Sequence, residues 1–516
     1  MSSDIPGTVE ALVAQVAELQ AELRVRELMI DKLRAQLAAL RRARFGASSE
    51  KLDRQIEQLE LILGDLEESR GARAERVVAA APPRPEAKPA HRAPLPSHLP
   101  REIVRHEAPG ACPACGGARF SPIGADEREV LEYVPAHFKV VVHVRPKLSC
   151  RDCETIRQAP MPSLPIERGL PGPALLAHVA VAKYADHLPL YRQSEIYQRS
   201  GVDLDRSTLA DWVGRMSMLL EPLAQEIGAH VRSGATLHAD DTPVPVLDPG
   251  RGKTKTGRLW TVVRDERPWA GPAPPAALYL YSSDRKGEHA ETLLSRCRGF
   301  LHADGYAGWG TLYTLQPASG VPRLAEVACW AHARRKIFEV HEHTASAAAK
   351  EALERMAELF AIEAEINGRP PDVRLAVRRE RSAPKLHELR DFLDKTLGQI
   401  SRKSTLAGAI RYTTSRWEAL ARFTTDGRLE MTNNAAERAI RPLALGRKNY
   451  LFAGSDAGGR RAAVLYTLIT TARLNGLDPE AWLADVVGRI ADHPMSRIGE
   501  LLPWNWRDAD DRRQAA

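Results

Sequence analysis

The run Leu237-His238-Ala239-Asp240 and its near copy Leu301-His302-Ala303-Asp304 decide the fold expected for this chain. In both runs apolar positions alternate with polar ones, as in a half-buried strand, and an aspartate stands where the strand is expected to end. Turn-forming sequence follows each run. Two strand ends that carry carboxylates can share one divalent metal site. The sequence therefore predicts that two strands deliver Asp240 and Asp304 to one place.

The neighbouring acid Asp241 competes with Asp240 for the role of ligand. Successive side chains of a strand point to opposite faces, so only one of the two can face the site. The second copy favours Asp240, because Asp304 is followed by Gly305 and not by another acid. We therefore expect an Asp241→Asn variant to retain substantial activity.

A third carboxylate is expected in Thr432-Asn433-Asn434-Ala435-Ala436-Glu437-Arg438. Asparagine is a favoured N-cap and the residues after it favour a helix, which predicts a helix start here. Glu437 stands three positions after Asn434, so it could instead close a capping box, and Glu430 is a competing acid. A basic cluster favours Glu437 as the residue that faces a polyanion: Arg438, Arg441, Arg447 and Lys448.

Length and charge limit the class of protein. A chain of 516 residues exceeds what one hydrophobic core usually serves, so several domains are expected. The net charge of +7 is compatible with a polyanionic partner. No run reaches the ~18 apolar residues of a spanning helix, and the first residues lack the features of a secretory signal. We expect a cytoplasmic, DNA-associated protein without a membrane partner.

Four of the six cysteines form two Cys-x-x-Cys pairs, Cys112 with Cys115 and Cys150 with Cys153. Paired knuckles of this kind can place four thiolates around one structural Zn²⁺. We expect a zinc-binding domain at 101–165. The interval between the pairs is long for a zinc ribbon, and His137 and His143 lie on it as alternative ligands.

A heptad of apolar residues runs through the first forty residues, from Val9 to Leu40. Such a narrow apolar seam is typical of a coiled coil, which needs a partner helix. We expect coiled-coil helices over 1–76 that form a homo-oligomer; an amphipathic helix packed on its own protein is the alternative. An Ala/Pro-rich linker follows at 77–100.

The remaining segments are expected to alternate helices and strands. Residues 166–233 predict helices with the proportions of a helix-turn-helix, which could equally support the sheet that follows. Strands are expected at 237–240, 259–263, 277–281, 300–304 and 326–330. Glu437 lies 133 positions after Asp304, against 64 between the two aspartates, so a helical insertion at about 331–425 should interrupt a catalytic domain at 234–455. A helical segment is expected at 456–516.

Two basic stretches are candidates for contacts with a phosphate backbone. The first is a turn between the expected strands, and the second begins the insertion. Their residues are Arg251, Lys253 and Lys255, and His332, Arg334, Arg335 and Lys336.

These stretches together resemble the transposases of the insertion sequence 66 group. The matching sequences are Ala239-Asp240-Asp241-Thr242-Pro243-Val244, Asp304-Gly305-Tyr306, Cys329-Trp330-Ala331-His332-Ala333-Arg334-Arg335-Lys336, Asn433-Asn434-Ala435-Ala436-Glu437-Arg438-Ala439 and Leu445-Gly446-Arg447-Lys448-Asn449, with the two cysteine pairs and the zipper-like start. One position departs: the family more often has Glu where this chain has Asp241.

The resemblance implies a multidomain α/β protein whose catalytic core has an RNase H-like fold. Two aspartates and a glutamate of this DDE core, here Asp240, Asp304 and Glu437, would hold two Mg²⁺ or Mn²⁺ ions for DNA cleavage and strand transfer. The implied partners are the terminal inverted repeats of an element, target DNA and accessory proteins encoded by the same element. A silent DNA-binding regulator and a structure-selective nuclease are the alternatives.

Overall fold

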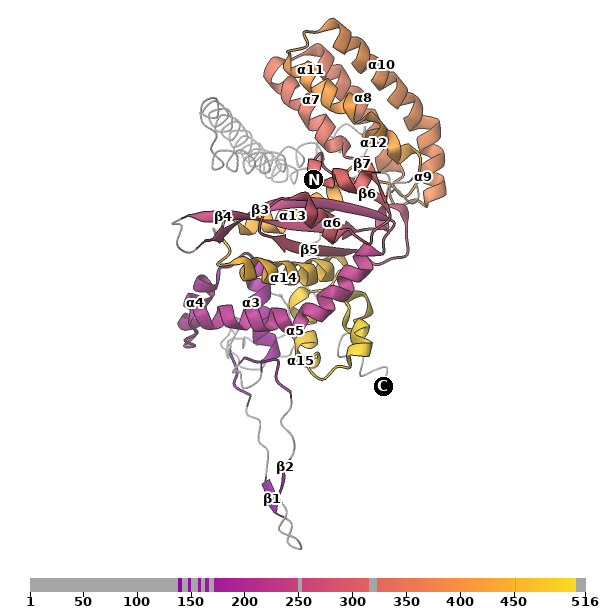
Figure 1. Cartoon of the computed structure of the whole chain (residues 1–516). Coiled ribbons are helices and arrows are strands. Elements are labelled where there is room, and N and C mark those ends of the chain that lie inside the picture. Colours follow the sequence, from indigo (N-terminus) through magenta and orange to yellow (C-terminus); the bar gives the residue numbers. More distant parts are fainter. Residues whose placement is uncertain are drawn as a thin grey trace, which may run out of the picture. The chain divides into compact units, whose positions relative to one another are not determined.

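The computed structural model describes residues 138–141, 147–149, 156–158, 163–166, 171–248, 253–314, 323–450 and 452–506 (Figure 1). The chain divides into a unit of residues 1–137 and a unit of residues 138–516, and all described residues belong to the second. The expected coiled coil, the linker, the four paired cysteines and Arg251 lie outside the described residues.

A five-stranded mixed sheet forms the centre of the described unit. Its strands are β3 (Thr236–Leu247), β4 (Thr254–Arg264), β5 (Ala276–Ser282), β6 (Gly299–Ala303) and β7 (Leu324–Ala328). Their order across the sheet is β5-β4-β3-β6-β7. Strands β3, β4 and β5 are antiparallel neighbours, whereas β6 runs parallel to β3 and β7 parallel to β6. A separate two-stranded ladder pairs β1 (Lys147–Ser149) with β2 (Ile156–Gln158).

Strand β3 is longer than the sequence suggested, because it continues through Asp240 to Leu247. The extension is held by β4, which pairs with β3 as far as Leu247 opposite Thr254. Pro243 and Pro245 of this extension have no backbone N–H to donate. No strand needs one on the side away from β4, because β6 has already ended there. There the carbonyl of Pro243 accepts from Arg447 at 2.6 Å, and that of Pro245 accepts from a backbone N–H at 2.8 Å.

Helices cover the sheet and share one apolar core with it. They are α3 (Pro173–Tyr184), α4 (Leu190–Arg199), α5 (Arg206–Arg232), α6 (Gly287–Leu293), α14 (Asp456–Leu474) and α15 (Pro479–Arg489). Helix α5 buries Leu209 and Trp212 and lies with α14 beside the sheet (Figure 1). Its N-cap is Asp205, whose carboxylate accepts from the backbone of Ser207 at 2.7 Å. Helix α5 thus packs against the sheet, and the helix-turn-helix role of this segment stays a prediction.

Helix α14 also closes one edge of the sheet. The edge strand β5 would leave backbone N–H groups unpaired, which is costly in a buried position. Thr467 accepts the N–H of Tyr279 at 3.0 Å, and Thr471 accepts that of Ala277 at 3.2 Å. The spacing of four residues puts both hydroxyls on one face of the helix.

A group of helices between β7 and α13 has a core of its own. Its members are α7 (Trp330–Thr344), α8 (Ala347–Glu365), α9 (Pro371–Val377), α10 (Ala383–Gln399), α11 (Thr405–Ser415) and α12 (Trp417–Ala421), and they are drawn in orange shades in Figure 1. The strand expected at 326–330 ends two residues earlier, because Cys329 is the N-cap of α7 and Trp330 is already helical. Helix α13 (Asn434–Gly446) follows the group and returns to the sheet.

Candidate active site

Asp240 and Asp304 come together because β3 and β6 are parallel neighbours in register. His238 lies opposite His302 in this pairing, and their rings stack at 4.1 Å. Each aspartate stands two residues after its histidine, on the same face of the sheet. Asp240 lies within the longer β3, whereas Asp304 directly follows the last residue of β6.

The turn after β6 is fixed by contacts to Asp304 and to its neighbours. An Asp304 carboxylate oxygen accepts from the backbone of Tyr306 at 3.1 Å and from the indole of Trp309 at 3.3 Å. Arg416, from the end of α11, donates to the carbonyl of Gly305 at 3.2 Å. A Cβ on Gly305 would lie 2.7 Å from this guanidinium, so a larger residue there would require the Arg416 side chain to shift.

Glu437 lies in the first turn of α13. The expected capping box does not form as proposed, because the N-cap is Asn433 rather than Asn434, which puts Glu437 one position too far along. Its carboxylate instead faces the start of α7. One oxygen lies 3.6 Å from Nδ1 of His332 and 3.9 Å from the sulfur of Cys329.

The three carboxylates influence one another electrostatically. Burial and then the nearby charge of Asp304 raise the pKa of Asp240 well above its ordinary value, and Asp241 and Glu437 add smaller contributions in the same direction. Among the described residues no basic side chain forms an ion pair with Asp240, and its carboxylate accepts a hydrogen bond from the backbone of Asp241 at 2.7 Å. The site therefore gathers more negative charge than its own side chains compensate.

Asp241 is engaged elsewhere, on arginines. Its fully buried carboxylate pairs with Arg258 at 3.0 Å and with Arg285 at 2.7 Å. Arg285 also lies over the ring of Tyr306 at 3.9 Å and so connects this ion pair with the turn after β6. Asp241 thus has structural partners that the sequence did not indicate.

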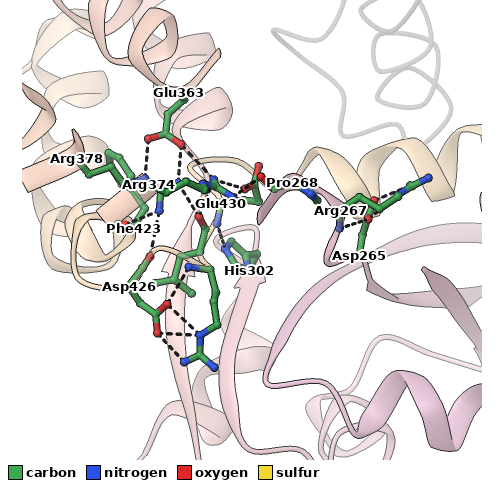
Figure 2. A network of polar contacts seen from close by, with 12 residues as sticks. Asp265, Arg267, Pro268, His302, Glu363, Arg374, Arg378, Phe423, Asp426 and Glu430 are labelled. Carbon is green, nitrogen blue, oxygen red and sulfur yellow. Dashed lines mark hydrogen bonds and ion pairs between the residues drawn. The ribbon is translucent and has the colours of Figure 1, made fainter. Parts of the chain in front are cut away.

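Glu430, the other competing acid, belongs to a buried ionic network (Figure 2). Its carboxylate accepts from Arg374, which is 1% exposed. Its backbone N–H donates to Nε2 of His302 at 3.0 Å. Burial raises the pKa of this acid, and Arg374 opposes the rise. With an arginine on its carboxylate, Glu430 is a poorer candidate than Glu437 for holding a metal ion.

The three carboxylates offer the kind of donor that hard divalent cations prefer. The described residues contain two groups of three donors within 4.8 Å of one another: Cys329, His332 and Glu437, and Asp284, Glu288 and His289. Asp240 and Asp304 belong to neither, so the three predicted carboxylates are spaced more widely than that limit. They are hard oxygen donors that lack a full complement of cationic partners, which suits Mg²⁺ or Mn²⁺.

The basic residues proposed for DNA contacts fall into two sets. Three are engaged within the protein: Lys255 pairs with Asp456 at 2.7 Å, Arg447 donates to Pro243, and His332 faces Glu437. The others lie on the surface, namely Lys253, Arg334, Arg335, Lys336, Arg438, Arg441 and Lys448.

Three residues at the site were missed or misjudged from the sequence. Arg285 and Arg416 approach from a loop and from the helical insertion, and no local pattern marks either. The capping box was considered with Asn434, yet Asn433 is the N-cap, and its side chain makes no capping bond but contacts β3. Only contacts between distant segments reveal these roles.

The fold and site together define an α/β protein whose central sheet gathers acidic side chains suited to a divalent cation. Four family models match the chain. They are described as Transposase IS66 family (residues 168–461), zinc-finger binding domain of transposase IS66 (109–154), IS66 C-terminal element (467–504) and Transposase C of IS166 homeodomain (32–104).

Similar chains occur in Sinorhizobium fredii (strain NBRC 101917 / NGR234). The uncharacterized protein y4hP is 45% identical over 94% of this chain and 89% of its own length. The uncharacterized protein y4qI is 39% identical over 96% of this chain and 93% of its own. The chain therefore belongs to the IS66 family of transposases, which confirms the resemblance seen in the sequence. In the part of the chain that the structure describes, no helix is both long and apolar enough to cross a membrane.

Proposed function

We propose that this transposase is a DDE-type enzyme in which Asp240, Asp304 and Glu437 hold divalent cations for DNA cleavage and strand joining. The observation that carries the proposal is the convergence of three acids: Asp240 on β3, Asp304 directly after β6 and Glu437 on α13. Among the described residues, Asp240 has no basic partner. Such uncompensated charge is costly unless a cation binds there.

The sheet supports an RNase H-like core. Three antiparallel strands are followed by two parallel ones, in the order β5-β4-β3-β6-β7, and the acids lie on the central strand, after its parallel neighbour and on a later helix. The resemblance implied two aspartates on a central sheet and a glutamate on a helix, and these positions are compatible with it. The helical insertion interrupts the core between β7 and α13.

The carboxylates act by binding and orienting. Mg²⁺ or Mn²⁺ would supply Lewis acidity at the phosphate and activate the attacking oxygen. Asp240, Asp304 and Glu437 would supply the carboxylate oxygens that hold these ions. Arg416 and Arg285 hold the Asp304 turn in place. Water would attack first and release a 3′-hydroxyl, which would then attack target DNA in line.

The surface arginines and lysines near these acids would contact the DNA backbone. Arg438 is adjacent to Glu437 in α13, and Arg334, Arg335 and Lys336 lie on the exposed face of α7, the helix that faces Glu437. The DNA would comprise the ends of the element and the target. Nothing in this proposal requires the DNA contacts of His332, Lys255 or Arg447 that the sequence suggested.

Two further parts of the proposal concern residues outside the described ones. One structural Zn²⁺ would be held by Cys112, Cys115, Cys150 and Cys153, which is supported by the zinc-finger family match at 109–154. A homo-oligomer would form through the expected coiled coil. Elemental analysis should find about one zinc per chain, and Cys150→Ser should lose it. Full zinc content in that variant would point to His137 or His143 as a ligand.

The decisive experiment measures cleavage and joining of plasmid DNA that carries candidate element ends, with Mg²⁺ and with EDTA. Wild type should cut and join only with the metal. Asp240→Asn, Asp304→Asn and Glu437→Gln should each abolish both steps while DNA is still bound, because an amide is a poor ligand for a hard cation. Cutting without joining would favour a nuclease. Binding without either step would favour a regulator.

A further inference from the structure

Asn433 occupies an unusual position for a helix N-cap. It is fully buried, and its side chain makes no hydrogen bond to the first turn of α13. An N-cap asparagine ordinarily accepts from a backbone N–H of that turn. The carboxamide of Asn433 points instead to β3, the strand that carries Asp240.

The carboxamide takes the place of a missing strand partner. Its Nδ2 donates to the carbonyl of Ala239 at 2.9 Å. Alternate carbonyls of a strand face the same side, and the carbonyl of Ala235 accepts from Phe300 of β6 at 2.8 Å. The carbonyl of Ala239 therefore faces the side on which β6 ends, one residue before Asp304. Asn433 supplies the hydrogen bond that β6 no longer provides.

The other oxygen and nitrogen atoms of Asn433 are also used. Its Oδ1 lies 3.3 Å from Nδ1 of His238, and because Nδ2 is the donor to Ala239, Oδ1 must accept from this ring. Its backbone N–H donates to the sulfur of Cys329 at 3.2 Å. Its carbonyl accepts from the backbone N–H of Glu437 at 3.2 Å. One residue thus contacts β3, the N-cap of α7 and the backbone of Glu437.

Cys329 and His332 define the other side of the Glu437 carboxylate. The Cys329 thiol lies 3.9 Å from a carboxylate oxygen, and Nδ1 of His332 lies 3.6 Å from it. This Nδ1 is buried and has no hydrogen-bond partner in the structure. Glu437 is therefore aligned from α7 by side chains, and near its own turn α13 is bonded to β3 through Asn433.

We propose that Asn433 is a positioning residue that fixes Glu437 relative to Asp240. It bonds directly to the residue before Asp240 on β3 and to the backbone of Glu437, so it sets the separation of the two carboxylates. The proposal rests on the metal-binding role proposed above for these acids. It adds that the register between α13 and β3 is set by one buried carboxamide and not by helix packing alone.

The competing explanation is that Asn433 merely starts a helix or fills space. Serine is as good an N-cap as asparagine but is too short to span from α13 to the Ala239 carbonyl. Asn433→Ser should therefore preserve the helix start and lose the bond to β3. Asn433→Ala also loses the bond to β3, and it offers no side-chain oxygen to the first turn of α13. The neighbouring exposed Asn434 offers a matched control, because Asn434→Ala removes a carboxamide from the same turn without breaking a contact to β3.

The test measures DNA cleavage against Mg²⁺ concentration, together with DNA binding and melting temperature. Asn433→Ala and Asn433→Ser should each slow cleavage roughly 10- to 100-fold at saturating DNA, as a small misplacement of a catalytic group does. Both should raise the Mg²⁺ concentration for half-maximal cleavage and leave DNA affinity unchanged. Thr467→Val, which unpairs an N–H of β5 away from the site, controls for lost stability.

Wild-type cleavage and Mg²⁺ requirement in Asn433→Ser would overturn the positioning role. So would an equal loss in Thr467→Val at a matched fall in melting temperature, because the effect would then follow stability. Failure of the proposed function looks different: wild type would not cleave, or Glu437→Gln would remain active, whatever the Asn433 variants do.

Discussion

At the scale of single residues, Asp240 is the clearest example of a side chain whose environment demands a ligand. Folding raises the pKa of this acid above its ordinary value of 3.8, so ionising Asp240 costs stability of the folded protein. This cost is absent at low pH, where Asp240 is protonated in both the folded and the unfolded state. The cost grows as pH rises above the ordinary pKa. In the folded protein without metal, burial and then the charge of Asp304 disfavour the ionised form of Asp240, and a bound cation would relieve that cost.

This predicts an inverse relation between stability and activity for one substitution. In EDTA at pH 7, Asp240→Asn should melt higher than wild type by about 1 °C for each kcal/mol of relieved cost, as expected for a unit of this size. Mg²⁺ should raise the melting temperature of wild type and not that of the variant. Differential scanning fluorimetry with a Mg²⁺ series measures both. A variant that melts lower in EDTA would show that the repulsion is unimportant.

Asp241 shows how far a sequence can mislead at the same scale. Alternation along a strand correctly separated it from Asp240, but the pattern could not reveal Arg258 and Arg285, which lie 17 and 44 positions away. The expectation that Asp241→Asn retains substantial activity stays a prediction, and the structure adds a cost in stability. An amide would leave two arginines with less compensation in a buried place.

We predict that Asp241→Ala lowers the free energy of unfolding by about 3 kcal/mol, because it breaks a buried ion pair on one side only. Any loss of activity should follow the unfolded fraction and not the metal concentration. Urea titration followed by tryptophan fluorescence gives the stability, and cleavage assays well below the melting temperature give the activity. Loss of metal-dependent cleavage in fully folded protein would instead place Asp241 in the site.

At the scale of elements, the repeated aspartate runs predicted that β3 and β6 bring their aspartates together. Two similar runs need only pair in parallel, with matching residues opposite each other, to do so. His238 opposite His302 brings Asp240 and Asp304 together without any other long-range information. The position of Glu437 is different. It depends on how the helical insertion returns the chain to the sheet. Two buried arginines fix that return: Arg374 within α9 and Arg378 directly after it.

Arg378 is central to that return (Figure 2). It is fully buried, pairs with Glu363 at 2.6 Å and donates to the carbonyls of Phe423 and Leu429 at 2.9 and 2.8 Å. Neither the sequence period of α8 nor that of α9 marks these contacts, because they join residues as much as 51 positions apart. The segment before α13 is therefore held from within the insertion.

Replacing Arg378 by Met should cost about 3–5 kcal/mol, since Glu363 and the two carbonyls lose their partner in the interior. Hydrogen exchange should quicken at 423–431 before it quickens in β3. The matched control is Arg381→Ala, which removes an exposed partner of Glu365 and should leave the unfolding midpoint almost unchanged. Equal effects of the two substitutions would mean that the buried network does not stabilise the insertion.

At the scale of the whole molecule, the modest net charge of +7 says less about DNA binding than the distribution of charge does. Several basic residues named from the sequence are engaged within the protein, so the surface set is smaller than the sequence suggests. Arg334, Arg335 and Lys336 remain exposed on α7. Their helix begins beside Cys329 and presents His332 to Glu437. Phosphate contacts there would place DNA near the acids.

A salt titration tests this assignment independently of catalysis. Phosphate contacts release counterions, so the logarithm of affinity falls with the logarithm of salt by about 0.9 for each contact on duplex DNA. Replacing Arg334, Arg335 and Lys336 together by Ala should therefore make that slope shallower by roughly 2 to 3. Lys395→Ala, an exposed charge on α10, serves as the control, with the slope expected to stay as in wild type. If the triple variant kept the wild-type slope, DNA would have to approach the carboxylates from another face, with Arg438 and Arg441 of α13 as the next candidates.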